Sequence, residues 1–587
     1  MDDPNRVTYF AATDARGRKQ PFGIKALDRA RHMYVIGKTG MGKSTLLENM
    51  AIQDIQNGEG MAFIDPHGSA VETLLEYIPA HRVNDVVYFA PFDLERPIAF
   101  NVMEDVGYDK RHLVVSGLMA TFKKIWVDAW SARMEYILSN TLLALLEYPG
   151  ATLLGVNRMY TDKAYRKKVI ENVKDPVVKD FWIKEFNTYT DRYTQEATPA
   201  IQNKIGQFTS NPLIRNIIGQ PHSSFDIRTL MDEKKILIIN LSKGLVGDTN
   251  MKLLGSMITT RIFLGAMSRA DLPPQELKKA SRFYFYVDEF QNFANETFAE
   301  ILSEARKYNL NLIIAHQYVE QMEEEVAAAV FGNVGTTIAF RVGPFDAEKL
   351  EVVFAPEFEP EDLVNLGFAQ IYLSLMIDGL GSRPFSAVTI PPIEPPARTY
   401  REEVIAASRA QFTHPREEVE GLIYEELASG DMGIPDPEPP KKQYGPQKRP
   451  ASPGNGYQGS KAPSERDTRP PLRQDQQREE RREPRPETPQ GRPAPELKEI
   501  LKAKSQEQQH KQEQSKGEKQ SVLKSALADV LKNAGVEAPK GSMPPPPQRQ
   551  QQAPRTEEKK VDRRDFKDTS VFEVPEEVLR EIFKKEL

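Results

Sequence analysis

Cysteine is absent from this sequence of 587 residues, and tryptophan occurs only 3 times. The lack of cysteine excludes a disulfide framework, a cysteine-ligated zinc site and a thiol nucleophile. The formal net charge is −6, so any contact with nucleic acid must come from local basic patches and not from the overall charge. We find no secretory leader and no stretch with the length and apolar character of a membrane span. We therefore expect a cytoplasmic protein, at most peripheral to the inner face of a membrane.

The segment 33–45 reads as an apolar strand, a glycine-rich turn and the first turn of a helix. It matches the phosphate-binding pattern G-x-x-x-x-G-K-[ST]. Glycines let successive backbone N–H groups face phosphate oxygens, and the new helix presents its positive end to the same anion. We predict that Lys43 reaches the β- and γ-phosphates of a nucleotide and that Ser44 ligates Mg²⁺. The predicted nucleotide-binding residues are Gly37, Lys38, Thr39, Gly40, Met41, Gly42, Lys43, Ser44 and Thr45.

Short apolar runs alternate with helical patterns around this loop, which indicates an α/β fold with a parallel sheet. After the loop, strands are predicted at 60–65, 85–90, 235–241, 282–287, 310–315, 336–341 and 369–376. Between 105 and 222 the strand runs disappear and helical spacing dominates. All three tryptophans lie there, and Trp126 and Trp130 begin a helical repeat that continues to Leu145. The segment 197–218 has the same helical spacing. Either core packing or nucleobase stacking explains these tryptophans.

Composition divides the chain into five parts. We predict the first part of a nucleotide-binding core at 1–104, an inserted all-helical domain at 105–222 and the second part of the core at 223–395. A helical extension is expected at 396–433, followed by a disordered tail at 434–587 that is rich in proline, glutamine and charged residues. Three short islands in the tail, 497–504, 522–534 and 571–583, either fold on a partner or keep only residual helix propensity.

A second acidic motif completes the predicted site. Hydrolysis at a P-loop needs one acid at the end of a nearby apolar strand to hold Mg²⁺, and a carboxylate to orient and deprotonate water. The run Phe283-Tyr-Phe-Tyr-Val-Asp288-Glu289 offers Asp288 for the metal and Glu289 for the water. Gln317 ends the next strand, where it either touches the γ-phosphate or is a satisfied strand-end amide.

Basic residues supply two further predictions. Arg306, at the end of the helix before Gln317, either stabilises transition-state charge in a neighbouring subunit's site or caps its own helix. Arg341 is a second candidate for the same role in trans. Four basic residues of the helical domain are candidates for DNA phosphate contacts, although a solvated helix face explains them equally well: Lys110, Arg111, Lys123 and Lys124.

Four motifs together resemble the HerA–FtsK superfamily of motor ATPases, and within it the TraG/TraD-like coupling proteins of conjugative DNA transfer by type IV secretion. They are Gly37–Thr45, Phe63–Gly68, Tyr286–Gln291 and Ile313–Gln317. The resemblance covers roughly residues 20–395, including the helical domain. It implies a RecA-like core with a mostly parallel sheet, ATP with Mg²⁺, and a hexameric ring that moves DNA through its channel. It also assigns the catalytic roles above to Lys43, Ser44, Asp288, Glu289 and Gln317, and places Arg306 where the family has its trans-acting arginine finger.

The resemblance leads to an ATP-driven DNA translocase of conjugative transfer as the main hypothesis. One alternative keeps the motor and changes the cargo to that of a protein-secretion, pilus or genome-packaging ATPase; another is a nucleotide-regulated scaffold that hardly turns over. Coupling proteins usually begin with transmembrane helices, which this sequence lacks. The chain is then either a soluble member, closer to HerA or TraB-like proteins, or is anchored by a partner. Relaxase or secretion-apparatus proteins are the expected partners of the tail.

Overall fold

The computed structural model describes residues 3–14, 18–104 and 106–428, so the predicted disordered tail and its three islands lie outside the described residues. Within the described part, eleven strands form one sheet and β11 and β12 form a separate pair. The strands are β1 (Val7–Thr13), β2 (Pro21–Lys25), β3 (Met33–Ile36), β4 (Gly60–Asp65), β5 (Val86–Phe89), β6 (Ile236–Asn240), β7 (Phe283–Val287), β8 (Leu310–His316), β9 (Thr336–Ala339), β10 (Gln370–Ser374), β11 (Met376–Ile377), β12 (Leu380–Gly381) and β13 (Phe385–Thr389).

The order in the large sheet is β2-β1-β13-β10-β9-β3-β8-β7-β4-β6-β5. All pairings from β9 through β3, β8, β7, β4 and β6 to β5 are parallel. The pairings of β9 with β10, β10 with β13, β13 with β1 and β1 with β2 are antiparallel. The predicted α/β fold with a mostly parallel, RecA-like sheet is therefore confirmed.

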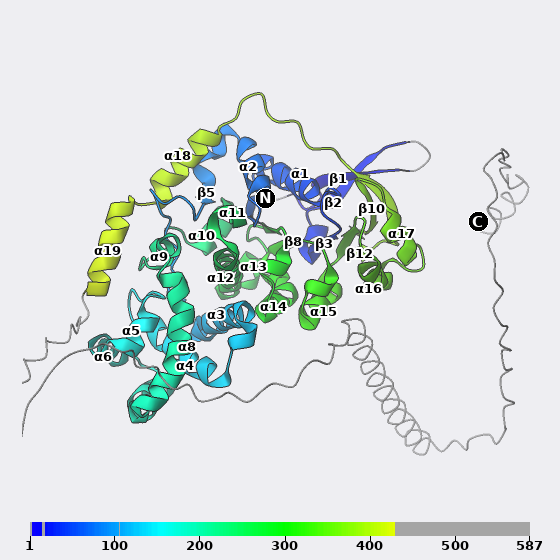
Figure 1. Ribbon diagram of the computed structural model, residues 1–587. Helices are drawn as coiled ribbons and strands as arrows, with labels where there is room; N and C mark the ends of the chain where they lie inside the picture. Colours follow the sequence, from blue (N-terminus) through cyan, green and yellow to red (C-terminus); the bar gives the residue numbers. More distant parts are fainter. Residues whose placement is uncertain (1–2, 15–17, 105, 429–587) are drawn as a thin grey trace, which may run out of the picture. The chain divides into compact units, whose positions relative to one another are not determined.

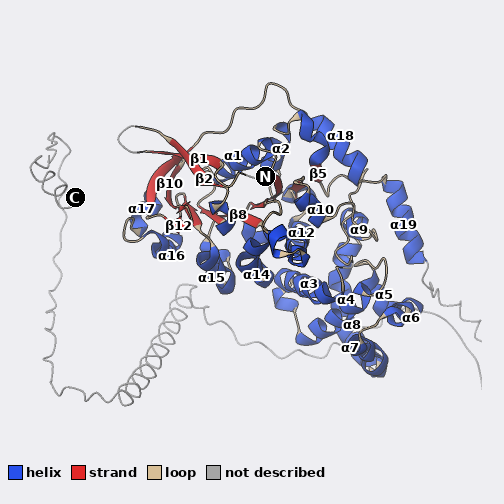
Figure 2. Ribbon diagram, turned by 180° about the vertical axis from the view of Figure 1, so that it is seen from behind, coloured by secondary structure: helices blue, strands red, loops and turns tan. Residues whose placement is uncertain are grey.

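Helices cover both faces of the sheet, as Figures 1 and 2 show. The helices are α1 (Lys43–Gln56), α2 (Ser69–Glu76), α3 (Arg111–Ile125), α4 (Ala132–Leu146), α5 (Gly155–Thr161), α6 (Lys163–Asn172), α7 (Pro176–Asp180), α8 (Asp191–Thr209), α9 (Pro212–Ile218), α10 (Ile227–Asp232), α11 (Lys243–Val246), α12 (Asp248–Met267), α13 (Pro274–Leu277), α14 (Glu296–Glu304), α15 (Glu324–Asn333), α16 (Pro344–Phe354), α17 (Pro360–Asn365), α18 (Arg401–Phe412) and α19 (Arg416–Ala428). In β3, Met33 and Val35 pack on the side of α1, and Tyr34 and Ile36 on the side of α12. Burial on both faces explains why the parallel strands read as continuous apolar runs.

The segment predicted as all-helical contains α3 to α9 and no strand among its described residues. Two helix predictions in it are wrong. The repeat from Trp126 to Leu145 is broken, because α3 ends at Ile125 and the Ser131 hydroxyl accepts a hydrogen bond from Met134 N to start α4. The helix predicted over 197–218 is two helices, since the Asn211 side chain caps α9.

The tryptophans of this segment contact protein side chains. Trp182 is fully buried and lies against Phe181 and Phe186. Trp126 stacks on Phe122, and Trp130 donates a hydrogen bond to Glu135 Oε2 at 2.7 Å. Core packing therefore accounts for Trp182.

The last two helices that the structure describes, α18 and α19, lie on the β5 side of the described chain (Figure 1). Helix α18 covers the edge strand β5, where Tyr88 N donates to Ser408 Oγ at 2.8 Å. Helix α19 buries Val419 and Ile423 against Leu154 of the helical segment. No helix in the part of the chain that the structure describes is both long and apolar enough to cross a bilayer.

Candidate active site

The carboxyl ends of four parallel strands meet at one edge of the sheet. Strand β8 lies between β3 and β7, with Ile36 opposite His316 and Val287 opposite Ile314. Strand β4 follows on the other side of β7. The P-loop after β3, the acidic pair after β7 and Gln317 after β8 are therefore brought to the same edge, although they are far apart in the sequence.

The P-loop follows β3 as a tight turn into α1. Gly37 N donates to His316 O at 3.2 Å and Lys38 N donates to Arg341 O at 2.8 Å, which ties the loop to the ends of the two strands beside β3. A Cβ on Gly37 would lie 2.5 Å from Phe340 Cβ. Gly42 has a φ of 113° at the start of α1, a conformation that side chains disfavour. The close approach at Gly37 and the backbone conformation of Gly42 explain why glycine is needed at both ends of the pattern.

The two halves of the predicted site are in contact. Ser44 Oγ donates to Asp288 Oδ2 at 3.2 Å. Lys43 Nζ is buried and donates to Gly37 O at 2.6 Å, and its charge interacts with both Asp288 and Glu289. The structure thus places an ammonium group, a hydroxyl and two carboxylates at the start of α1, where a nucleotide triphosphate would bind.

Glu289 lies at the centre of a hydrogen-bond network. Gln291 Nε2 donates to Glu289 Oε2 at 2.6 Å, and Gln317 Nε2 donates to Glu289 Oε1. Gln317 in turn accepts from Thr39 Oγ1 of the P-loop at 3.0 Å. The φ of Glu289 is 47°, a left-handed conformation that costs free energy in a non-glycine residue and recurs at functional sites. Both oxygens of this carboxylate are therefore held by amides, and Gln317 links one of them to the P-loop.

Burial and like charges shift the acids of the site. Desolvation, with Glu289 and Asp65 nearby, raises the pKa of Asp288 to about 6. Desolvation, with Asp65 and Asp288 nearby, raises the pKa of Glu48 to about 7. Desolvation also lowers the pKa of Lys43, although the two adjacent acids oppose this change. Such a concentration of negative charge favours a cation at this edge.

Two further acids, which the sequence analysis did not assign to the site, lie near Asp288. Glu48 follows Ser44 by one helical turn and so faces the same side of α1, a spacing that could have identified it. Asp65 ends β4 in the Asp-Pro-His-Gly turn, where its carboxylate accepts from His67 N at 2.7 Å and from Ala70 N at 2.8 Å. Asp65 therefore holds the start of α2 in addition to charging the site.

The two candidate arginines lie in different places. Arg306 is exposed in the turn Ala305–Tyr308 just before β8, so it lies toward the amino ends of the strands, away from its own P-loop. Its charge acts on buried His32, which precedes β3 at the same end. Arg341 instead follows β9 beside the P-loop, where its carbonyl accepts from Lys38 N.

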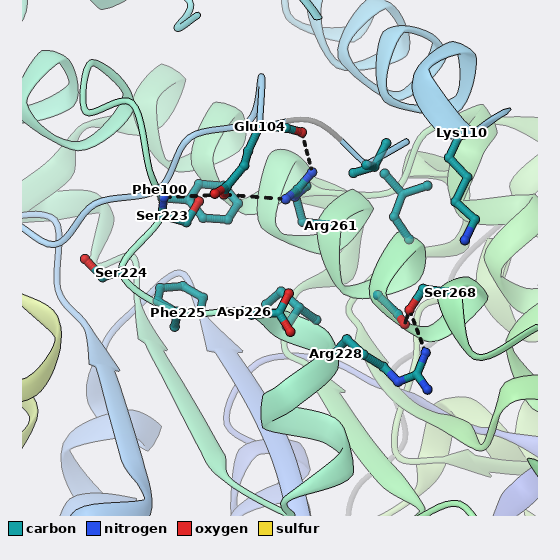
Figure 3. Close-up of a pocket in the computed structure, with 14 residues that line it drawn as sticks. Phe100, Glu104, Lys110, Ser223, Ser224, Phe225, Asp226, Arg228, Arg261 and Ser268 are labelled. Carbon is teal, nitrogen blue, oxygen red and sulfur yellow. Dashed lines mark hydrogen bonds and ion pairs between the residues drawn. The ribbon is translucent and has the colours of Figure 1, made fainter. Parts of the chain in front are cut away.

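A cavity of about 380 Å³ lies elsewhere, where the chain enters and leaves the helical segment (Figure 3). Its walls come from 100–110 and 223–228, and α12 adds a third side. Two of its arginines bond to other lining residues: Arg261 pairs with Glu104, and Arg228 donates to Ser268 Oγ at 3.0 Å. These contacts join the two crossings to α12 and to the turn after it, and we place the candidate active site at the P-loop edge.

Solved structures with a similar fold include the bacterial conjugative coupling protein TrwBdeltaN70 in an unbound form. It is 16% identical, with a TM-score of 0.48, and the match covers 68% of this chain and 92% of that one. TrwB in complex with ADP and Mg²⁺ is 16% identical over 68% and 98%, with a TM-score of 0.47. VirB4 of Thermoanaerobacter pseudethanolicus is 15% identical, and the match covers 69% of this chain and 99% of that one, with a TM-score of 0.43.

No curated protein matches the chain. The family model of the type IV secretion-system coupling protein DNA-binding domain matches residues 23–352. This range includes the P-loop, the helical segment, the acidic pair and Gln317. Because it spans more than half of the sequence, the resemblance drawn from the four motifs is confirmed, and the chain belongs to the type IV secretion-system coupling protein family.

Proposed function

We propose that this protein is an ATP-driven DNA translocase that serves conjugative transfer. The observation that carries the proposal is the contact between Ser44 and Asp288, which joins the P-loop to the acidic strand end in one site. Membership in the coupling protein family, whose model describes a DNA-binding domain, supports DNA as the cargo. The alternatives to be tested against this proposal are a motor that moves a protein and a nucleotide-regulated scaffold.

Each residue of the site has a proposed role. Lys43 neutralises the β- and γ-phosphates, while the N–H groups of 37–45 surround them. Glu289 orients the attacking water and accepts its proton, because its two oxygens are held by Gln291 and Gln317. Gln317 couples the position of Glu289 to the presence of the γ-phosphate, since it bonds to both Thr39 and the Glu289 carboxylate.

Mg²⁺ fits this donor set. In the described part of the chain no cluster of three or more acidic or histidine side chains is arranged to hold a metal ion. Mg²⁺ is usually held by one or two protein oxygens together with substrate phosphates, and Ser44 and Asp288 supply such oxygens. A bound divalent cation would offset the desolvation and the like charges that raise the pKa of Asp288, and it would supply charge neutralisation at the transferred phosphoryl group.

A ring of subunits, which we propose to be a hexamer, explains the position of Arg306. Its guanidinium is exposed and separated by β8 from its own P-loop, so it can serve only the site of another subunit. Arg341 is the alternative candidate for the same role in trans. Relaxase or secretion-apparatus proteins remain the proposed partners of the residues beyond 428.

The proposal is tested by measuring ATP hydrolysis of the full chain with and without DNA. We expect hydrolysis that depends on Mg²⁺ and rises when single- or double-stranded DNA is added, with no turnover in Lys43→Ala. Activity stimulated by a secreted protein and indifferent to DNA would support the motor with a protein cargo. Tight ATP binding without turnover in the wild type would support the scaffold.

A further inference from the structure

We infer that Lys124 is a positioning residue that links the helical segment to the hydrolytic carboxylate of Glu289. The inference rests on the proposed function, because it concerns the rate of ATP hydrolysis. Three contacts carry it: Lys124 to the loop after β7, Gln291 of that loop to Glu289, and α3 to α12.

Lys124 is turned away from solvent and toward the active site loop. Its Nζ donates to Gln291 O at 2.7 Å and also to Ala294 O. Desolvation lowers the pKa of this lysine to about 8, although the charge of Glu323 opposes this change, so the ammonium group is largely withdrawn from water. Its sequence neighbour Lys123 is exposed. Of the two adjacent lysines, Lys124 therefore cannot offer its ammonium group to DNA without releasing the loop.

The loop that Lys124 holds contains the residue that orients Glu289. Gln291 takes part through two groups: its carbonyl accepts from Lys124, and its side-chain amide donates to Glu289 Oε2 at 2.6 Å. Asn292 Nδ2 also donates to Glu289 O at 3.0 Å. The left-handed φ of Glu289 lies at the start of this loop. A shift of the loop therefore moves the carboxylate and its backbone together.

Helix α3 is closely packed and can transmit a shift. Gly117 approaches α12 so closely that a Cβ there would lie 2.5 Å from Thr260 Cγ2. Lys124 lies in the last turn of α3, where the helix also packs on α4 and α14. A displacement of the helical segment therefore reaches Gln291 through one side chain. A misplacement of about 1 Å at a catalytic group costs up to about 100-fold in rate.

A purely structural role for Lys124, as a cation that satisfies two loop carbonyls, predicts a different result. It predicts loss of thermal stability when the ammonium group is removed, with kcat of the folded fraction unchanged. The inference predicts that kcat falls while ATP affinity and thermal unfolding stay near the wild-type values. It also predicts a smaller ratio of the rates with and without DNA, because the helical segment then no longer acts on Glu289.

The sequence allows a sharp test, since it contains no cysteine. Lys124→Cys introduces a unique thiol in the full chain, and its thiolate displaces bromide from 2-bromoethylamine to give a thioether analogue of lysine. Mass spectrometry confirms the modification before ATP hydrolysis is measured. We expect Lys124→Cys to lose about 10- to 100-fold in kcat with KM for ATP within about 2-fold, and the aminoethylated protein to recover most of the rate.

Controls separate the inference from other causes. Lys167→Cys, at an exposed lysine of α6 and treated in the same way, is expected to keep the wild-type rate before and after alkylation. Lys124→Met combined with Gln291→Ala is expected to be no slower than the slower single variant, because both act through one path. A Lys124→Cys protein that keeps the wild-type kcat, or loses rate that alkylation does not restore, overturns the inference while the proposed function stands. A wild-type protein without ATPase activity overturns the proposed function itself.

Discussion

Replacing Asp288 by asparagine is expected to stabilise the protein when no nucleotide or metal is present. Asparagine keeps the size of the side chain, and its oxygen can still accept from Glu289 N, as Asp288 Oδ1 does at 2.9 Å. Its amide can donate to Ser44 Oγ, which replaces the present bond. The substitution therefore removes the buried charge and preserves the packing.

The magnitude follows from the pKa of Asp288, which rises from 3.8 to about 6 on folding. The folded state holds the proton of Asp288 more tightly than the unfolded state does. Ionisation of Asp288 therefore lowers the free energy of unfolding as the pH rises above about 4. The loss is complete above the folded pKa. A shift of about 2 pKa units corresponds to about 3 kcal/mol of unfolding free energy. The cost is about half as large at pH 5.

The assay is urea unfolding of the full chain in EDTA, followed by circular dichroism at pH 5 and at pH 8. Asp288→Asn should raise the free energy of unfolding by up to about 3 kcal/mol at pH 8 and by about half of that at pH 5. Adding Mg²⁺ with a non-hydrolysable ATP analogue should stabilise the wild type more than the variant. Asp109→Asn makes the same change on an exposed carboxyl and should alter stability by less than about 0.5 kcal/mol. A variant less stable than the wild type at pH 8, or a gain that does not change with pH, would refute the reasoning.

Three other predictions address catalysis, assembly and stability. Glu289→Gln should bind ATP with near wild-type affinity but hydrolyse it at least about 100-fold more slowly, as measured by equilibrium binding and phosphate release; lost binding would contradict its role as base. Arg306→Ala should be inactive alone and regain activity when mixed with Lys43→Ala subunits, whereas failure to complement would favour Arg341. Arg29→Ala should lower the free energy of unfolding by about 3–5 kcal/mol, because Arg29 bonds to Asp54 at 2.7 and 2.8 Å in the core; a loss below about 1 kcal/mol would show that water reaches the pair.

The main parts of the site could be predicted because they depend on strand ends. A glycine-rich turn after one apolar strand and an acidic pair after another must meet at one edge when the strands are parallel, whatever lies between them in the sequence. Asp288 and Ser44 obey this rule, as does Gln317 on the strand between. The contact of Lys124 with the loop after β7 could not be predicted from the sequence, because no fixed spacing in the sequence relates the end of a helix to a distant loop.

The predictions of helix boundaries failed where a single capping residue interrupts a longer apolar repeat. The repeat from Trp126 to Leu145 contains Ser131, whose hydroxyl caps a new helix, and periodicity alone does not register a cap. The break before α9 was readable in principle, because Asn211 is followed by proline in the first helical turn. The raised pKa of Glu48 required the tertiary structure, since it arises from burial and from the charges of Asp65 at the end of β4 and Asp288 just after β7.

The covering of β5 by α18 bears on how shorter versions of this protein should be designed. A fragment that stops at the sequence-predicted core boundary near 395 would remove Ser408 from Tyr88 N and leave the outermost parallel strand with open backbone groups. Such an edge recruits strands from other molecules. Recombinant fragments that end after α19 should remain monodisperse where fragments that end before Arg401 precipitate.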